Sequence, residues 1–385
     1  MRGRPRRLAG LVQSDIRRMT RECERVGGIN LGQGICDLVT PPLVRDGAIE
    51  AIRAGHSTYS FAEGIEPLRR AIAIKLERDN GLRADPATEI VVTAGSSGAY
   101  ASALFALLDP GDGIVLFEPY YGYHLNTALV AGLEPQFVTL DAPRFRIDEA
   151  RLRAAVRPNT RAIVLCSPSN PSGHMLDEEE LRSVERIARE HDLWVITDEI
   201  YEYIRYDGRP HLSPAAIGSL AERTVTIMGL SKTFSITGWR LGYAVAREDV
   251  ARAIALVHDL FFICAPTPLQ HGVAAGFAAP KSYFDSLQSE FARKREWTCA
   301  ALERAGLQPI VPEGAYYVLA DVSRLGHETS RDAALAILER TKVATVPGTS
   351  FFQDPNLGER FVRVCYAKED PVLQQACERL AALRG

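Results

Sequence analysis

The chain has 385 residues and a formal net charge of −3 at pH 7, and 46% of its residues are hydrophobic and 24% charged. This composition is typical of a globular protein with a large core. The mildly acidic balance argues against nucleic acid as the main partner. No apolar run approaches the length of a membrane span, so we expect no membrane partner either.

The seven cysteines are scattered and form neither a CxxC pair nor a zinc-binding spacing. We therefore expect no metal site, and a reducing compartment. The basic start, residues 1–7, lacks the apolar stretch of a secretion signal. Together these features predict a cytoplasmic protein.

The middle of the chain alternates short apolar runs with helical segments. Residues 90–93 predict a buried strand, and Gly95-Ser96-Ser97-Gly98 then leads into a helix over 99–108. Further strands are predicted over 114–117, 162–166, 193–197, 224–228 and 243–246, with a charged helix over 178–191. This alternation predicts an α/β fold with a mainly parallel sheet covered on both faces. Ligands of such sheets gather at the carboxyl ends of the strands.

The C-terminal part has a different pattern. It predicts a long helix over 283–305, a strand over 315–320, a helix over 331–340, short strands over 343–345 and 361–364, and a last helix over 371–383. These elements predict a smaller α+β domain. We expect a large domain over 43–280 and a small domain made of 1–42 and 281–385.

Lys232 follows one apolar strand and precedes another, in Gly229-Leu230-Ser231-Lys232. On a rigid turn between buried strands, a desolvated amine has a lowered pKa and can form a Schiff base with an aldehyde. Arg240, a little further on, offers a planar cation suited to a phosphate. An aldehyde and a phosphate together indicate pyridoxal 5′-phosphate (PLP). A solvated surface lysine is the alternative, so the hypothesis depends on the other motifs.

A phosphate site is predicted where Gly95-Ser96-Ser97-Gly98 opens a helix directly after a strand, because free backbone amides and the helix dipole attract an anion there. A simple N-cap is the alternative. Gly32-Gln33-Gly34 lacks the third glycine of a dinucleotide fingerprint, and the segment before Lys232 lacks the glycine of a P-loop. We therefore exclude both nucleotide motifs.

Three residues that follow strands could hold a planar ring. Asp198 could pair with a protonated pyridine nitrogen, although a helix N-cap is an equal alternative. Asn170 lies in a loop made rigid by two prolines and a glycine, where its amide could hold a phenolate oxygen; an ordinary turn is the alternative. Tyr121 could stack on the ring, or pack in the core.

Arg363 lies inside a predicted strand, between Val362 and Val364. A buried arginine is costly unless it is paired. A two-pronged bond to a substrate carboxylate would explain it. An internal ion pair is the alternative.

These motifs, in this order from about Gln13 to Leu383, resemble the class I/II aminotransferases of the fold-type I PLP enzymes. The resemblance implies a seven-stranded large domain, and it implies site roles residue by residue. Gly34 would offer its amide to the substrate carboxylate, and Tyr59 would reach the phosphate of the neighbouring subunit. The remaining roles fall on Ser96, Ser97, Ser231 and Arg240 (phosphate), Tyr121 (ring stacking), Asn170 and Tyr201 (3′-oxygen), Asp198 (pyridine nitrogen), Lys232 (Schiff base) and Arg363 (substrate carboxylate).

The chain departs from the family pattern at three places. Gly229 stands where many relatives have a phosphate-binding serine, for which Ser231 compensates. Cys36 replaces a usual proline, and Tyr121 stands where typical aspartate aminotransferases carry tryptophan. The opening over 13–17 and the run over 28–31 look closest to the kynurenine, glutamine and methionine transaminase branch.

The resemblance thus predicts a PLP-dependent aminotransferase that moves the amino group of an aromatic, methionine or glutamine-like L-amino acid to a 2-oxo acid. Lys232, Asp198 and Tyr201 would be its catalytic residues. Because Tyr59 would act across subunits, we expect a homodimer with shared active sites. The alternatives are an aspartate-type aminotransferase and a PLP-dependent C–S or β-eliminating lyase, since the fold does not fix the reaction. A non-catalytic PLP-binding regulator is a third class, which the early first motif disfavours.

Overall fold

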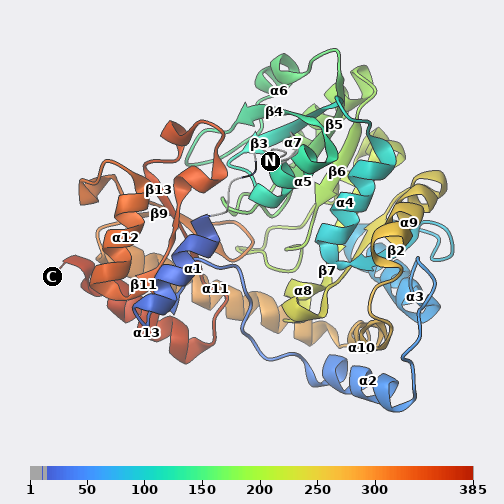
Figure 1. Ribbon diagram of the computed structural model, residues 1–385, viewed down its shortest axis with the longest axis horizontal. Helices are drawn as coiled ribbons and strands as arrows, with labels where there is room; N and C mark the ends of the chain where they lie inside the picture. The colour runs from blue at the N-terminus through green and yellow to red at the C-terminus, as the bar shows by residue number, and fades with distance from the viewer. Residues whose placement is uncertain (1–10, 12–14, 385) are drawn as a thin grey trace, which may run out of the picture.

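A computed structural model describes residue 11 and residues 15–384. The basic residues 1–7, and Gln13 and Ser14 of the family-like opening, lie outside the described residues. Two lobes make up the molecule, each built on its own sheet (Figure 1). We call them the large unit and the small unit.

The large unit contains a seven-stranded sheet. Its strands lie in the order β2 (Ile90–Ala94), β8 (Leu241–Val245), β7 (Thr224–Gly229), β6 (Trp194–Asp198), β5 (Thr160–Cys166), β3 (Gly113–Glu118) and β4 (Glu134–Thr139). Only β8 is antiparallel to its neighbours. The central strands are buried at nearly every position, which explains their continuous Val and Ile runs. The predicted fold class, α/β with a mainly parallel seven-stranded sheet, is confirmed.

Helices cover both faces of this sheet. One face packs on α4 (Gly95–Leu107), α5 (Gly122–Ala131) and α9 (Glu248–Phe262). The other packs on α6 (Glu149–Ala155), α7 (Glu178–Glu190), α3 (Glu66–Lys75) and α10 (Thr267–Gly276), and α2 (Pro42–Arg53) lies against α10. A capping box between Asp177 and Glu180 fixes the start of α7.

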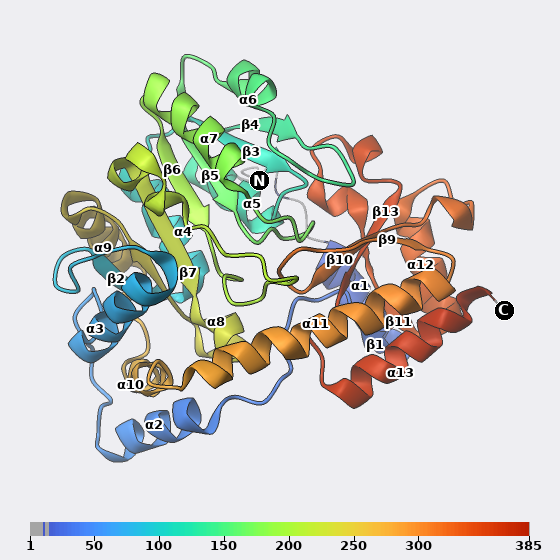
Figure 2. The same cartoon turned by 180° about the vertical axis from the view of Figure 1, so that it is seen from behind.

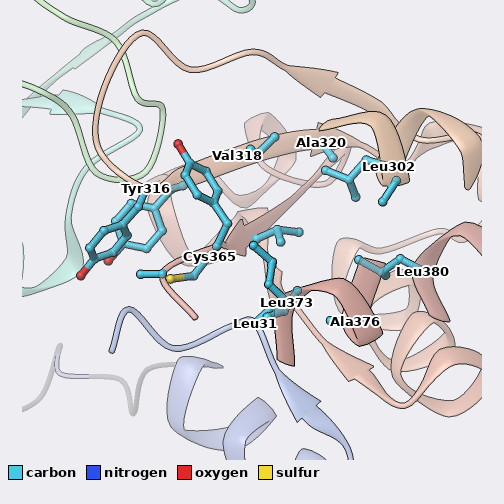
Figure 3. Packing of buried hydrophobic residues seen from close by; sticks show 14 of the residues in the cluster. Leu31, Leu302, Tyr316, Val318, Ala320, Cys365, Leu373, Ala376 and Leu380 are labelled. Carbon is cyan, nitrogen blue, oxygen red and sulfur yellow. The ribbon is translucent and has the colours of Figure 1, made fainter. Parts of the chain in front are cut away.

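The small unit has a four-stranded sheet in the order β12 (Val346–Pro347), β13 (Phe361–Cys365), β10 (Tyr317–Asp321) and β9 (Gln308–Ile310). Its helices are α1 (Asp15–Arg25), α12 (Ser330–Thr341) and α13 (Asp370–Ala381). β1 (Ile29–Asn30) pairs in parallel with β11 (Val343–Ala344). The buried core of this unit includes Leu31, Leu302, Val318 and Leu373 (Figure 3).

The long helix α11 (Lys281–Arg304) runs from the end of α10 to the side of α13 and so joins the two lobes (Figure 2). The domain limits 43–280 and 1–42 with 281–385 stay a prediction. Among the described helices, none is both long enough and apolar enough to cross a membrane.

Two local predictions are wrong in detail, and the edge strand β4 was not predicted. The predicted helix over 99–108 begins earlier, at Gly95, so the Gly-Ser-Ser-Gly motif forms its first turn. Lys232 lies in a one-turn helix, α8 (Leu230–Thr233), and not on a plain turn. The sequence patterns also gave no sign of β4, because this edge strand alternates partly exposed and buried positions and contains Pro135 and Gln136.

Candidate active site

A cleft of about 370 Å³ lies where the large and small units meet. One wall comes from segments that follow β2, β3, β5, β6 and β7, and the opposite wall from β10, β13 and the segment after β1. Eleven of the twelve predicted site residues line it: Gly34, Ser96, Ser97, Tyr121, Asn170, Asp198, Tyr201, Ser231, Lys232, Arg240 and Arg363.

Tyr59 is the exception. It lies on the loop between α2 and α3, it is 75% exposed, and it does not line the cleft of its own chain. Side-chain bonds hold this loop against α10: Thr267 donates to the carbonyl of Thr58 at 2.8 Å, and Gln270 donates to Ser60 at 3.1 Å. Tyr59 is therefore presented outward on an anchored loop.

Lys232 points toward the segment that follows β1. Its Nζ donates to the Gly34 carbonyl at 3.0 Å and lies 5.3 Å from the ring centre of Tyr316. No carboxylate in the described part of the chain forms an ion pair with it. Desolvation in the cleft lowers the pKa of the amine from its usual 10.5 to about 8. The neutral fraction near neutral pH is therefore much larger than that of an ordinary lysine, and it is available for attack on a carbonyl or for proton transfer.

Arg240 lies beside the first turn of α4. The backbone of Arg240 is left-handed, with φ 56°. The guanidinium of Arg240 donates to Thr237 O and to Ser97 Oγ, both at 3.0 Å. No side chain caps the start of α4, so the first amides of the helix are free for a ligand. Gly95 has φ +74°, and a Cβ there would lie 2.5 Å from an Arg240 nitrogen. These groups form an open cradle for an anion.

Asp198 is the last residue of β6, and a histidine holds its carboxylate. Nε2 of His124, in α5, lies 3.0 Å from Oδ2 of Asp198, and both side chains are buried. Oδ1 accepts from the N–H of Ile200 at 3.3 Å, and the chain continues as a turn. No helix begins at Asp198, so the helix N-cap alternative is wrong. The carboxylate instead faces the cleft with a fixed orientation.

His124 was not predicted as a site residue from the sequence. It lies in the first turn of α5, and no motif marks it. Its one signal is its position three residues after Tyr121, on the same helical turn, and the two rings meet edge to face with their centres 5.2 Å apart. The carbonyl of His124 also accepts from the Tyr100 hydroxyl at 3.3 Å.

Arg363 in β13 is 1% exposed. It donates to Asn170 Oδ1 at 2.9 Å and to Gly32 O at 2.7 Å, and its guanidinium lies 4.3 Å from the ring centre of Tyr317. Its Nε has no partner. No acidic side chain among the described residues pairs with it, so the internal ion pair, the alternative weighed above, is not present. A buried cation with an unused donor fits an incoming carboxylate.

Two tyrosines, Tyr201 and Tyr317, line the cleft, and a third, Tyr316, is fully buried against them. The hydroxyls of Tyr201 and Tyr317 lie 3.1 Å apart, and Tyr316 donates to the Gly34 carbonyl at 3.1 Å. Burial and neighbouring groups raise the pKa of Tyr201 well above its usual 10, so its phenol keeps its proton and can donate. Tyr316 and Tyr317 were not predicted as site residues, because in the sequence they are part of an ordinary apolar strand.

Comparison with known proteins identifies the family. Residues 26–380 match the family model of aminotransferase class I and II. A probable N-succinyldiaminopimelate aminotransferase of Mycobacterium tuberculosis is 34% identical, with 98% of each chain covered. An aspartate/prephenate aminotransferase of Thermus thermophilus is 34% identical over 100% of both chains, and a kynurenine–oxoglutarate transaminase of Dictyostelium discoideum is 31% identical over 94% of this chain and 92% of its own.

The solved structure of N-succinyldiaminopimelate aminotransferase from Mycobacterium tuberculosis superposes with a TM-score of 0.95 and 33% identity, covering 99% of this chain and 100% of that one. The chain therefore belongs to the class I and II aminotransferases. It is a PLP-dependent transaminase that acts on amino and oxo acids, as the resemblance predicted. Relatives of similar identity are named for different substrates, so their names do not fix the substrate of this chain.

The cleft fits PLP and a carboxylate substrate. Four cationic side chains line it, Arg17, Lys232, Arg240 and Arg363, and none of them pairs with an acidic group in the parts of the chain that the structure describes. An amine, an anion cradle and a buried guanidinium match the aldehyde and phosphate of PLP and the carboxylate of an amino acid. No grouping of His, Cys, Asp and Glu suited to a metal occurs among the described residues.

Proposed function

We propose that this aminotransferase takes its amino group from an L-amino acid with a bulky, uncharged side chain (aromatic, methionine or glutamine-like) and passes it to a 2-oxo acid. The observation that carries the proposal is the meeting of Lys232, Asp198, Arg240 and Arg363 in one cleft. When bound, PLP supplies an aldehyde that captures the amino group and a ring that accepts electrons from Cα.

The phosphate end is held by the first amides of α4, at Ser96 and Ser97, and by Arg240, with Ser231 nearby in the cleft. This set combines a helix dipole with a fixed cation. At the ring, Asn170 and the protonated Tyr201 hold the 3′-oxygen, and Tyr121 stacks on the face. Asp198 pairs with the pyridine nitrogen, and His124 keeps that carboxylate in place.

Lys232 is both the tether of PLP and the base of the reaction. Its lowered pKa, about 8, leaves the amine able to take a proton from substrate Cα. Gly34 O, 3.0 Å from Nζ, orients the amine in the cleft. The same amine then donates this proton to complete the transfer.

Arg363 and the Gly34 amide clamp the α-carboxylate of the substrate. Asn170 and Gly32 fix the guanidinium by bonds of 2.9 and 2.7 Å, so it is in position before the substrate arrives. Little conformational entropy is then lost on binding. This part of the site binds the α-carboxylate, which all amino acids share.

The substrate side chain meets Ile16, Ile35 and Tyr123, which also line the cleft. Tyr123 stacks on Tyr121 at 5.3 Å and extends the aromatic wall. These groups favour a bulky apolar or aromatic side chain. Arg17 is the observation that favours the aspartate-type alternative, because an exposed cation at the same cleft could receive a second carboxylate.

Two further features support a homodimer with shared sites. Tyr59 faces away from its own cleft. The C-terminal end of α9 exposes Leu260, Phe261 and Phe262, and the ring of Phe105 in α4 packs at a tilt against Phe261. Large exposed apolar surfaces of this kind mark interfaces. A second copy that covers this face would bring its Tyr59 toward the phosphate cradle, and we propose cytoplasmic location for the same dimer.

The test is a screen of amino acids against the PLP-loaded protein, read by the change in cofactor absorbance and by product analysis. Stoichiometric transfer to a 2-oxo acid is expected. Release of ammonia with pyruvate or 2-oxobutyrate would establish the lyase alternative instead. Lys232→Ala should abolish transfer while circular dichroism stays unchanged, and borohydride should fix the cofactor to Lys232 of the unmodified protein. Fixation to another lysine would refute the assignment.

A further inference from the structure

Asn170 lies on a loop, residues 167–176, that the small unit holds at two points. The first is the bond from Arg363 to Asn170 described above. The second is Glu313, between β9 and β10. One carboxylate oxygen of Glu313 accepts from the N–H of Met175 at 3.0 Å and lies 3.2 Å from Nδ1 of His174.

The backbone of the small unit meets the same loop. The N–H groups of Glu313 and Gly314 donate to the carbonyl of Gly173 at 3.0 and 2.9 Å. Gly173 has φ +72°, and a Cβ at this position would collide with Pro312. Glycine alone permits both the conformation and the close approach. The end of the Asn170 loop is thus in direct backbone contact with the small unit.

His174 lies between two carboxylates. Its Nε2 is 3.0 and 3.1 Å from the oxygens of Glu180, and its Nδ1 faces Glu313. The Glu180 carboxylate is itself fixed by the N–H groups of Ile147, at 2.7 Å, and Asp177, at 3.1 Å. With a carboxylate at each ring nitrogen, both nitrogens must donate, and only the protonated imidazole does so.

The surrounding charges support this state. Arg209 pairs with Glu313 at 2.7 Å, and Arg146, which pairs with Asp177, lies 3.9 Å from Glu180. Burial alone lowers the pKa of His174, but its hydrogen bonds to Glu180 and Glu313 outweigh burial and raise the pKa to about 9. The folded pKa lies above the unfolded value of 6.5. The stabilisation is therefore complete below pH 6.5 and is lost as the pH rises through about 9.

We propose that His174 and Glu313 are positioning residues of the transamination reaction: their ion pair fixes the Asn170 loop to the small unit, and so holds Asn170 where it meets both the cofactor and Arg363. Neither residue lines the cleft, so both act through Asn170. The inference rests on the role proposed for Asn170 above.

The test compares His174→Gln and Glu313→Gln with Asp207→Asn in the PLP-loaded protein. Asp207 also joins the two lobes, through a pair with Arg295 of α11 at 2.7 Å, but it does not contact the Asn170 loop. Two quantities are measured: amide hydrogen exchange over residues 169–176, and the Kd of 3-phenylpropionate, a carboxylate that cannot react. Each test variant should speed exchange and raise the Kd about tenfold, as for loss of one charged hydrogen bond. Asp207→Asn should change neither.

An unchanged Kd in both test variants, or an equal rise in Asp207→Asn, would overturn the proposal. The unmodified protein gives a second test that needs no variant. Protection of residues 169–176, corrected for the intrinsic exchange rate, should fall between pH 8 and pH 10, around the pKa of about 9, and constant protection would also overturn it. These readouts do not require turnover, so a protein that binds the carboxylate without transferring amino groups would refute the proposed function and leave this inference standing.

Discussion

Nε2 of His124 lies 3.0 Å from Oδ2 of Asp198, although 74 positions separate the two residues in the chain. The histidine fixes the carboxylate that we propose as partner of the pyridine nitrogen. Asp198→Asn should retain PLP but lose turnover by on the order of 10³-fold, because an amide cannot hold the pyridine proton. Steady-state kcat with the best amino acid of the screen measures this effect. Near-normal turnover would remove Asp198 from the mechanism.

His124→Asn should have a smaller effect of the same kind. A hydrogen bond to a charged group is worth roughly 1.5–3 kcal/mol, so we expect kcat to fall about 10- to 100-fold. His191→Asn, at the C-terminal end of α7 and outside the lining of the cleft, serves as the control. A loss of thermal stability with unchanged kcat would assign His124 to packing alone.

The lowered pKa of Lys232 has a measurable consequence in the protein freed of PLP. Reductive methylation needs a neutral amine, so Lys232 should react with a midpoint near pH 8. Mass spectrometry of the modified peptide measures the profile, with the exposed Lys281 as the comparison site. Because the folded pKa lies below the unfolded one, the unfolded state binds more protons between pH 8 and 10.5, and stability gained from this residue increases with pH there. A midpoint near 10.5 would contradict the desolvation argument.

Arg363→Leu should weaken the binding of every α-carboxylate substrate to a similar extent. The guanidinium is already held by Asn170 and Gly32, and its Nε is unused. Loss of a charged hydrogen-bonded pair costs roughly 1.5–3 kcal/mol, which corresponds to about 10- to 100-fold in kcat/KM. The measurement is kcat/KM for phenylalanine, methionine and glutamine. An effect confined to one of them would make Arg363 a side-chain selector.

Tyr59→Phe mixed with Arg240→Ala should recover part of the activity that each variant lacks. If Tyr59 acts across subunits, a mixed dimer gathers both lesions in one site and leaves the other intact. The measurement is specific activity after subunit exchange, with native mass spectrometry to prove that mixed dimers form. Proven exchange without recovery would place Tyr59 outside a shared site.

The substrate proposal predicts that aspartate is a poorer amino donor than phenylalanine, methionine or glutamine. A short carboxylate placed against Ile16, Ile35 and Tyr123 would lose contact with water without gaining a partner from these side chains, which is costly. The measurement is kcat/KM for the four donors with one oxo acid. A tenfold advantage for aspartate, about 1.4 kcal/mol, would establish the aspartate-type alternative.

Arg17 decides between these outcomes, and α1 offers its control in the exposed Arg18, which does not line the cleft. If the substrate side chain is uncharged, Arg17→Gln should keep kcat/KM for phenylalanine within about twofold of that of the unmodified protein. If Arg17 instead receives a second carboxylate, its removal should lower kcat/KM for the acidic donor about tenfold or more, and Arg18→Gln should not.

The sequence by itself determined those parts of this protein that a short segment can express. Strand and helix periods predicted the parallel sheet, and the segments after its strands predicted the cleft residues Asn170, Asp198 and Lys232. These predictions hold because buried strands need continuous apolar runs, and because the ends of parallel strands meet at one edge. The apolar run over 243–246 predicted strand β8 but not its antiparallel direction. The edge strand β4 carries no such unambiguous pattern, so it was not recognised.

Only the tertiary structure decided which distant side chains meet. No local pattern links Asp198 with His124, Arg363 with Asn170, or Lys232 with the Gly34 carbonyl, because packing and not chain proximity brings these segments together. The direction in which Tyr59 faces, and the position of His174 between Glu180 and Glu313, were settled in the same way. The sequence supplies the chemical groups, and the contact between the two units sets their distances and their pKa values.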